Sequence, residues 1–422
     1  MTRVAVVGLG KIGLPLAALY AGKGHHVIGA DISPEVVATL NAGRCHVGGE
    51  PGLEAAVAAA HNAGRLQATT DSAEAVAQSE VVVVMVRVGI DAAGHADYHY
   101  LDLAANAIGR GLRPGTLVIL ESTVPVGATR NRFGHRLCGA SGLDAGAFRL
   151  AYSPERVSSG TVYRDLATYP KLVGGVDAAG GEAAAAFYRG VLDAEVMLLK
   201  DAETAEFAKL AESIYRDVNI ALANELATAA ERLGVSYADA ARAGNSQPYS
   251  HLHTPGLGVG GHCIPVYPYF LTRATNTPLI SLGREVNDAM AEHGVQRLVE
   301  ALDGLAGKTV LILGLAYRGG VKEAELSSAL LVAESLRRHG ARVLVNDPLY
   351  SNEELQAHGL EPAPLPPATP VDAVILQATH AEYARLDYGS IPGCKVVLDG
   401  RGALDRLTIE AAGLRYIAIG EP

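Results

Sequence analysis

Short runs of aliphatic residues recur along the chain, each bounded by glycine, proline or charged residues. In the first half they occupy residues 3–7, 26–30, 81–86 and 117–120. Runs of this length without alternating polar positions are typical of strands buried in a parallel sheet. Because helical stretches separate these runs, the pattern predicts a doubly wound α/β domain.

A second pattern of the same kind begins at Lys308, where a strand leads into a glycine turn. A helix is expected over about residues 327–340, and the proline-rich stretch 361–370 is expected to be a surface connection. The strands predicted in this half begin at residue 308 and cover residues 341–347, 371–379 and 394–401. The second half is therefore expected to be another doubly wound domain.

The segment 201–234 has no proline, one closing glycine and apolar residues at helical spacing. It predicts a single helix that is longer than the helices of ordinary domains, and such helices often connect domains or build a dimer core. We therefore expect two Rossmann-like doubly wound α/β domains joined by a long central helix and a helical dimerisation domain. The expected boundaries are 1–198, 199–300 and 301–422.

Composition narrows the classes of function. The chain of 422 residues carries 35 basic and 45 acidic residues, a net charge of −10, which argues against nucleic acid as its main partner. Its four cysteines lie far apart with no C-x-x-C pair, so a zinc knuckle or disulfide scaffold is not expected and the cytoplasm is the expected location. The longest aliphatic run has the length of a strand, so no membrane span is expected.

A glycine motif follows the first predicted strand and opens a helix. Gly8 can make the tight turn, Gly10 can let the backbone approach a pyrophosphate, and Gly13 can allow close packing of the helix on the sheet. Asp31 ends the next strand, where its carboxylate can accept hydrogen bonds from both ribose hydroxyls and would repel a 2′-phosphate. The motif predicts dinucleotide binding and favours NAD over NADP. A purely structural glycine turn is the alternative.

The segment 256–268, here called the cysteine loop, is rich in glycine and proline, which predicts an irregular loop with many free N–H groups. Cys263 lies within it and could be a thiolate nucleophile, although a loop cysteine taken alone is more often inert. His251, His253 and His262 are close by in sequence. No metal site is expected, because adjacent His262 and Cys263 cannot easily bind one ion with suitable geometry.

Further segments form an ordered series along the chain. They read ESTVPVG at 121–127, SPERV at 153–157, PKLVG at 170–174, KLAESIYRDVNIALANE at 209–225, GLAY at 314–317 and DGR at 399–401. Together with the cysteine loop they resemble the UDP-glucose/GDP-mannose dehydrogenase family of nucleotide-sugar 6-dehydrogenases. The glycine turn is most similar to the branch that acts on UDP-N-acetylhexosamines. The resemblance covers nearly the whole chain.

This resemblance implies NAD-dependent oxidation of the 6-hydroxyl of a nucleotide-activated hexose, most often a UDP-sugar, to the uronic acid. Because the reaction removes four electrons, two NAD would be reduced in turn while Cys263 holds the substrate as a thiohemiacetal and then a thioester. Lys209 would stabilise the oxyanion and relay protons, and Thr123 would orient a water or the hydroxyl. Glu155 would activate water for thioester hydrolysis.

The resemblance also implies two sets of binding residues and a homodimer. The expected cofactor contacts are Gly8, Gly10, Lys11, Ile12, Gly13, Asp31, Ser122 and Thr123. The expected substrate contacts are Glu155, Arg156, Val157, Lys209, Asn219, Gly260, Tyr317 and Arg401, the last of which often reaches across a subunit boundary in the family.

Two positions depart from the family pattern. Tyr267 stands where the family places aspartate, four residues after Cys263, and Ser213 stands where it places asparagine, four residues after Lys209. We assign Ser213 and Tyr267 to the catalytic set, but a phenol with a pKa of about 10 cannot replace a carboxylate as a charged acceptor. The chain could therefore stop after one two-electron oxidation or use another nucleotide-linked substrate. A non-catalytic paralogue is the third possibility, against which Cys263, Lys209 and Glu155 argue.

Overall fold

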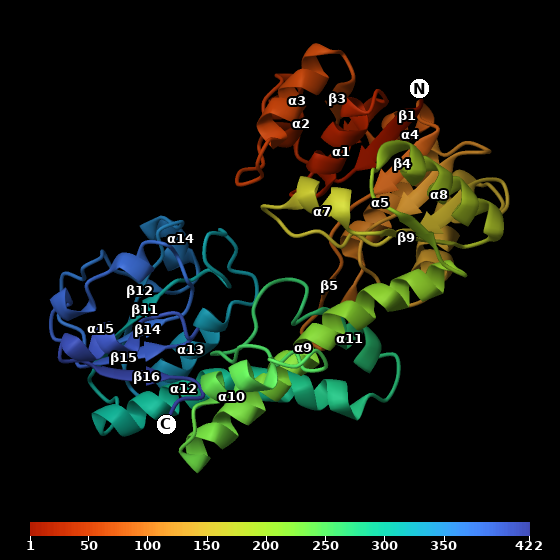
Figure 1. Ribbon diagram of the computed structural model, residues 1–422. Helices are drawn as coiled ribbons and strands as arrows, with labels where there is room; N and C mark the ends of the chain where they lie inside the picture. Colours follow the sequence, from red (N-terminus) through yellow and green to blue (C-terminus); the bar gives the residue numbers. More distant parts are fainter. The chain divides into compact units, whose positions relative to one another are not determined.

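The computed structural model describes all residues from 1 to 422, and it divides into two compact units. Unit 1 comprises Met1–Glu212 with Tyr269–Ala274, and unit 2 comprises Ser213–Pro268 with Thr275–Pro422. Each unit is built around its own sheet, as Figure 1 shows. Helix α9 (Ala202–Leu233) and the short helix α11 (Tyr267–Thr272) contribute residues to both units.

Unit 1 contains an eight-stranded sheet in the order β10-β9-β8-β7-β4-β1-β2-β3. The strands are β1 Arg3–Val7, β2 His26–Ala30, β3 Leu66–Thr69, β4 Val81–Val84, β7 Leu117–Leu120, β8 Arg149–Tyr152, β9 Lys171–Gly175 and β10 Val196–Leu198. Neighbouring strands run parallel except β8 and β9, which are antiparallel. The predicted doubly wound sheet is confirmed. The reversal at β9 was not predicted, because an apolar run carries no information about strand direction.

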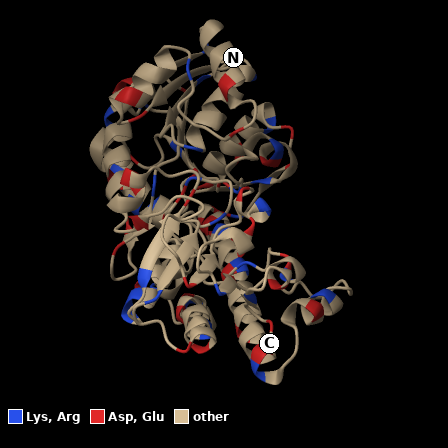
Figure 2. Ribbon diagram, turned by 90° about the vertical axis from the view of Figure 1, so that its left-hand side faces the viewer, with Lys and Arg blue, Asp and Glu red and all other residues tan.

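Helices and a small hairpin complete unit 1. The helices are α1 Gly13–Gly22, α2 Pro34–Asn41, α3 Leu53–Asn62, α4 Ser72–Ala77, α5 His99–Gly111, the π-helical η1 Thr129–Gly134, α6 His135–Ser141, α7 Val162–Thr168 and α8 Ala178–Val191. The hairpin pairs β5 (Gly89–Ile90) with β6 (Ala96–Asp97). In Figure 2 the strands are largely tan, while acidic and basic residues gather on helices and loops, as expected for strands buried on both faces.

Unit 2 contains a six-stranded parallel sheet in the order β13-β12-β11-β14-β15-β16. The strands are β11 Thr309–Leu313, β12 Arg342–Asn346, β13 Glu361–Pro362, β14 Ala373–Leu376, β15 Val396–Asp399 and β16 Arg415–Ala418. Its helical segments are α10 Tyr237–Gly244, α12 Pro278–Leu302, α13 Ser328–Arg338, α14 Asn352–Ala357, α15 Arg406–Ala411, η2 Tyr383–Arg385 and η3 Tyr388–Ser390. The proline-rich stretch adds the edge strand β13, where a proline without an N–H is tolerated.

The long helix was predicted within one residue at each end, whereas the 25-residue helix α12 lies mostly in the region 199–300 that was expected to be helical but was not predicted as an individual helix. In unit 2 the second half of α9 packs on α12 through buried polar pairs. Asn224 donates to Asn287 over 2.8 Å, and Arg284 lies 2.6 Å from Asp217. Neither α9 nor α12, nor any other helix, has both the length and the apolar composition needed to cross a bilayer.

Candidate active site

The predicted cofactor residues of unit 1 collect at the carboxyl edge of its sheet. Gly8 follows β1, Asp31 follows β2, and Ser122 with Thr123 follows β7. From β1 the chain builds the sheet outward in one direction through β2 and β3, and then in the other direction through β4 and β7. The carboxyl ends of β1 and β4 therefore mark the switch point at which open α/β sheets bind ligands. The sheet therefore brings together residues that lie more than a hundred positions apart in sequence.

The glycine turn has the geometry that the motif predicted. Gly8 has φ +92°, and a Cβ there would lie 2.1 Å from the carbonyl oxygen of Met85. A Cβ on Gly13 would lie 1.9 Å from the carbonyl oxygen of Gly8, whereas Gly10 has open space around it. Only glycine fits at Gly8 and Gly13, and Gly10 leaves room for a ligand to approach the backbone.

Asp31 is fixed beside this turn by two backbone donors. The N–H of Leu9 donates to Oδ2 and the N–H of Ser33 donates to Oδ1, each over 2.9 Å. Each carboxylate oxygen keeps a second lone pair for a ribose hydroxyl. Nearby, Lys11 is exposed and Ile12 is half-buried at the start of α1. These residues fit an NAD molecule bound across the turn.

Ser122 and Thr123 differ in their surroundings. Ser122 is buried, and its hydroxyl accepts a 2.9 Å hydrogen bond from the N–H of Val86, which ties the end of β7 to the chain after β4. This bond explains why the strand predicted over 81–86 ends at Val84, since the backbone leaves the ladder there. Thr123 is half-buried, so its side chain is the one of this pair that a bound molecule can reach.

Glu155 and Lys209 are neighbours within unit 1. Lys209 donates from Nζ to the backbone oxygen of Glu155 over 2.6 Å. The Glu155 carboxylate accepts from the N–H groups of Arg156 and Val157 at Oε1, and from Lys171 at Oε2 over 2.9 Å. Burial acts to raise the pKa of Glu155, but the charge and hydrogen bond of Lys171, together with the Arg156 N–H and the charge of Lys209, leave that pKa below its ordinary value.

A buried charge cluster that was not predicted lies beneath these residues. Lys171 sits between Glu155 and Glu121, 2.8 Å from the latter, and Tyr188 donates to the other oxygen of Glu121. Burial raises the pKa of Glu121 to about 7 although Lys171 opposes that shift. A lysine at the first position of an otherwise apolar strand was the signal in the sequence, since such a group is buried only with a partner.

The cysteine loop belongs to unit 2 and is anchored on α9. The N–H of Gly256 donates to Oδ1 of Asn224 over 2.9 Å, and the N–H of Gly261 donates to the backbone oxygen of Glu325 over 2.9 Å. A Cβ on Gly260 would lie 2.8 Å from the Cβ of Tyr317, which follows β11. The structure therefore brings the predicted pair Gly260 and Tyr317 together, at the carboxyl edge of the second sheet.

Cys263 is half-buried and meets the residue that departs from the family pattern. Its sulfur lies 3.5 Å from the hydroxyl of Tyr267, and the N–H of Tyr267 donates to the carbonyl of Cys263 over 2.9 Å. Beside it, Nδ1 of His262 pairs with a carboxylate oxygen of Glu323. Hydrogen bonds with Cys263 and then with Glu323 raise the pKa of His262 to about 10. No group of three or more His, Cys, Asp or Glu is arranged to hold a metal ion.

The remaining predicted residues of unit 2 are engaged locally. Arg401 donates from Nε to the backbone oxygen of Gln377 over 2.6 Å, and burial lowers its pKa to about 10. A Cβ on Gly256 would lie 3.2 Å from the Arg401 guanidinium, so this arginine lies against the cysteine loop. Asn219 donates to the Tyr215 carbonyl of its own helix over 2.7 Å, and Ser213 is buried on α9.

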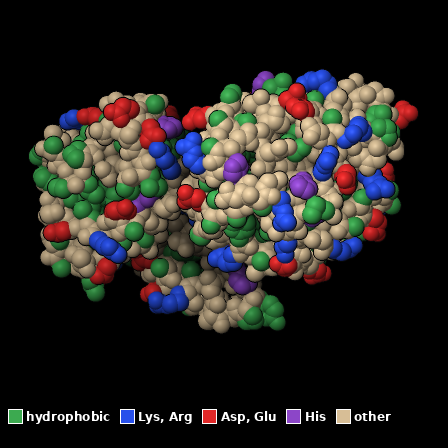
Figure 3. Space-filling view, turned by 90° about the horizontal axis from the view of Figure 1, so that it is seen from above, with side chains coloured by type: hydrophobic (Ala, Val, Ile, Leu, Met, Phe, Trp, Pro, Cys, Tyr) green, Lys and Arg blue, Asp and Glu red, His purple; other side chains and the backbone are tan.

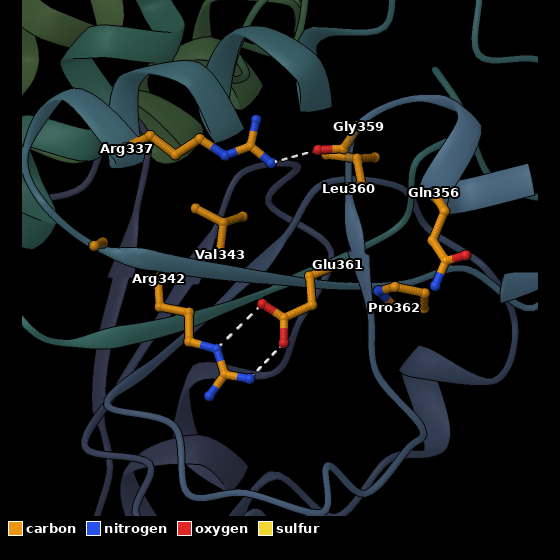
Figure 4. Close-up of a pocket in the computed structure, with 9 residues that line it drawn as sticks. Arg337, Arg342, Val343, Gln356, Gly359, Leu360, Glu361 and Pro362 are labelled. Carbon is orange, nitrogen blue, oxygen red and sulfur yellow. Dashed lines mark hydrogen bonds and ion pairs between the residues drawn. The ribbon is translucent and has the colours of Figure 1, made fainter. Parts of the chain in front are cut away.

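A separate cavity of about 480 Å³ opens beside the edge strand β13 (Figure 4). Its two arginines are already occupied, because Arg342 pairs with Glu361 and Arg337 donates to the carbonyl of Gly359 over 2.7 Å. The cavity lies at the amino end of β12, whereas ligands of such sheets bind at the carboxyl ends. It is therefore distinct from the site built by the cysteine loop.

An NAD-type glycine turn with its acid on one sheet, and a cysteine on a glycine-rich loop beside a second sheet, define a dinucleotide-dependent dehydrogenase. Three domain models of the UDP-glucose/GDP-mannose dehydrogenase family match this chain. The NAD binding domain matches residues 2–192, the central domain 203–289 and the UDP binding domain 311–406. The chain belongs to this family. It is an NAD-dependent nucleotide-sugar dehydrogenase, which confirms the predicted family, fold and cofactor, and the non-catalytic alternative is not favoured.

Several similar proteins agree with this family assignment. A UDP-N-acetyl-D-mannosamine dehydrogenase of Pyrococcus horikoshii is 34% identical, over 95% of this chain and 96% of its own length. An NDP-N-acetyl-D-galactosaminuronic acid dehydrogenase of Ralstonia solanacearum is also 34% identical, over 94% and 95%. The solved structure of a UDP-glucose dehydrogenase from Pyrobaculum islandicum has a TM-score of 0.89 and 30% identity, covering 100% of this chain and 98% of its own.

Proposed function

We propose that the protein oxidises the 6-hydroxyl of a UDP-N-acetylhexosamine to the uronic acid, using two NAD and a covalent intermediate on Cys263. The observation that carries this proposal is the presentation of Cys263 on a glycine loop held against Tyr317 at the carboxyl edge of the unit 2 sheet. The similarity to UDP-N-acetyl-D-mannosamine dehydrogenases supports an N-acetylated UDP-sugar as the substrate class.

The chain's own residues have distinct tasks in this reaction. Bound NAD supplies the hydride acceptor. The Cys263 sulfur adds to the aldehyde carbon to give a thiohemiacetal, whose oxidation gives a thioester, and water then releases the acid and restores the thiol. Lys209 stabilises the oxyanion, and Thr123 orients the hydroxyl or the water. Glu155, kept ionised by Lys171, receives a proton from the attacking water.

A homodimer is the assembly that we propose, formed through an apolar stripe on α9. Tyr215, Leu222, Leu226 and Leu233 are exposed by 56%, 46%, 39% and 76%. Their spacings of seven, four and seven residues put them on one face of the helix. Leaving such a stripe in water is unfavourable, and a second copy offers a matching surface. We place the enzyme in the cytoplasm, where its free cysteines stay reduced.

The reaction can be tested with purified protein, NAD and a panel of UDP-N-acetylmannosamine, UDP-N-acetylglucosamine, UDP-glucose and GDP-mannose. We expect two NADH for each acid formed with an N-acetylated UDP-sugar. Cys263→Ser should lower acid formation by about 10³-fold or more, because the covalent route is lost. Cys138→Ser, at a half-buried cysteine of unit 1, is the matched control and should keep activity.

Each other outcome of this test has a definite meaning. One NADH per substrate with an aldehyde product would favour a single oxidation, as the substitutions at Ser213 and Tyr267 allow. Full acid formation by Cys263→Ser, or no NADH with any of the nucleotide sugars, would contradict the proposal.

A further inference from the structure

His262 directly precedes Cys263 and has no part in the reaction described above. Its imidazole is 53% exposed, but its Nδ1 pairs with a Glu323 carboxylate that is only 13% exposed. Glu323 lies in the loop that follows β11, and its backbone oxygen accepts from the N–H of Tyr317 over 3.0 Å. The histidine is therefore held in place by an acid that is itself fixed to the second sheet.

Within unit 2 the sulfur of Cys263 lies 3.5 Å from the phenol of Tyr267, and the preceding residue, His262, hydrogen-bonds with Cys263 and with Glu323. The hydrogen bond with Cys263 and then that with Glu323 raise the pKa of His262 above its ordinary value, and the Glu323 carboxylate holds the imidazole where its charge is favoured. A positive charge beside a thiol favours the thiolate. The arrangement supplies that charge next to the sulfur.

Tyr267 acts in the same direction. Its hydroxyl, 3.5 Å from the Cys263 sulfur, can accept from a thiol or donate to a thiolate. A carboxylate at this position would place a second negative charge beside the thiolate and oppose its formation. The exchange of an acid for a phenol therefore removes a negative charge that would otherwise lie beside the sulfur and compete with it for the positive charge of His262.

We propose that His262, held by Glu323, is a positioning residue that takes the proton of Cys263 and keeps the sulfur as a thiolate, with Tyr267 donating a hydrogen bond to it. One proton moves from sulfur to the imidazole, and no electrons are transferred. The inference deepens the proposed function and rests on it for the consequence in turnover, which is a nucleophile ready before the aldehyde forms. The ionisation of Cys263 itself can be measured without substrate.

The experiment measures, as a function of pH, the rate at which iodoacetamide alkylates Cys263, followed by peptide mass spectrometry, together with the ultraviolet absorbance of the thiolate relative to Cys263→Ser. At pH values below the pKa of Cys263 in the unaltered protein, His262→Gln should lower both by about tenfold, which corresponds to a rise of one unit in the pKa of Cys263. Glu323→Gln and Tyr267→Phe should lower them less. His262→Lys keeps the positive charge and should restore most of the thiolate.

His339→Gln is the matched control, because His339 pairs with Glu292 over 2.8 Å elsewhere in unit 2. It should leave alkylation of Cys263 unchanged. The proposal is overturned if His262→Gln alkylates at the rate of the unaltered protein, or if folded His262→Lys, checked by circular dichroism, restores nothing. Loss of alkylation in His262→Gln supports the proposal even if no nucleotide sugar is oxidised, so the two proposals fail separately.

Discussion

Two glycines of one motif have different physical reasons to be glycine. Gly8 is required by the protein itself, because its φ is positive and a Cβ would meet a backbone oxygen at 2.1 Å. Gly10 has open space around it, so its lack of a side chain is of use only to a ligand that approaches there. The motif predicts both glycines, but only the three-dimensional structure shows that folding requires Gly8, whereas Gly10 is left open to a ligand.

We expect Gly8→Ala and Gly10→Ala to have separable effects. Gly8→Ala should lower the free energy of unfolding by about 2–3 kcal/mol, through the steric clash and backbone strain. Gly10→Ala should change it by less than about 0.5 kcal/mol while weakening NAD binding by about tenfold or more. Urea unfolding and NAD titration measure the two quantities. Equal loss of stability in both variants would contradict this assignment.

The ionisation state of Glu155 likewise depends chiefly on one neighbouring side chain. The sequence motif places a carboxylate after β8, but its ionised state follows from Lys171, which lies 16 positions later and reaches it across the sheet. The same holds for His262, whose partner Glu323 is 61 positions away. Residue types could be predicted from sequence, but their protonation depends on partners that only folding supplies.

At the scale of elements, helix α9 supports the loop that carries the predicted Ser122 and Thr123. Glu206, at the start of α9 and completely buried, accepts from the N–H of Gly127 over 2.5 Å and from that of Thr129 over 2.8 Å, just where η1 begins. Burial raises the pKa of Glu206 to about 7, although these hydrogen bonds act to lower it. The Glu206 carboxyl group thus links α9 to the start of η1, and its contribution to the free energy of unfolding depends on pH.

This raised pKa predicts how stability varies with pH. At pH values below about 4.5, the pKa of Glu206 in the unfolded chain, its carboxyl group is protonated in both the folded and the unfolded state. Between about pH 4.5 and 7 it stays protonated in the folded state but is ionised in the unfolded state. The contribution of Glu206 to the free energy of unfolding is therefore lost as the pH rises through about 7, by about 3 kcal/mol in total.

Glu206→Gln should remove that part of the pH dependence, as measured by urea unfolding from pH 4.5 to 8. The same variant should be less stable at low pH by about 1–3 kcal/mol, because an amide offers one acceptor to two backbone donors. Glu203→Gln is the control on the same helix, because the hydrogen bond with Arg130 lowers the pKa of Glu203, so its pKa shift is opposite in direction to that of Glu206. A fall in stability that persists unchanged in Glu206→Gln would be evidence against this role.

At the scale of the whole molecule, the proposed dimer depends on the exposed stripe of α9. Figure 3 shows acidic and basic side chains intermingled on the visible face of each unit, in contrast to the apolar composition of the stripe. Burying large apolar side chains at the centre of an interface provides most of its binding energy. The second half of α9 packs against α12, so the helix that carries the stripe is held in place within unit 2.

The double variant Leu222→Glu/Leu226→Glu should weaken dimerisation by at least about a hundredfold, because charged carboxylates replace two apolar contacts. Sedimentation velocity at several protein concentrations measures the shift to monomer. Leu407→Glu is the control, since Leu407 is 75% exposed on α15 outside the stripe. A double variant that sediments like the unaltered protein would exclude this surface as the interface.

The sequence by itself determined the two doubly wound sheets, the long helix, the NAD turn and the cysteine loop, because each is encoded by residues close together in the chain. Periodicity, glycine positions and short motifs involve residues that are close together in sequence, so they can be recognised without knowledge of the tertiary structure. Tertiary structure alone decided the reversal at β9 and the partners of Glu155 and His262. Those features depend on contacts between distant segments, and an apolar run or a single charged residue carries no record of the neighbour that it will meet.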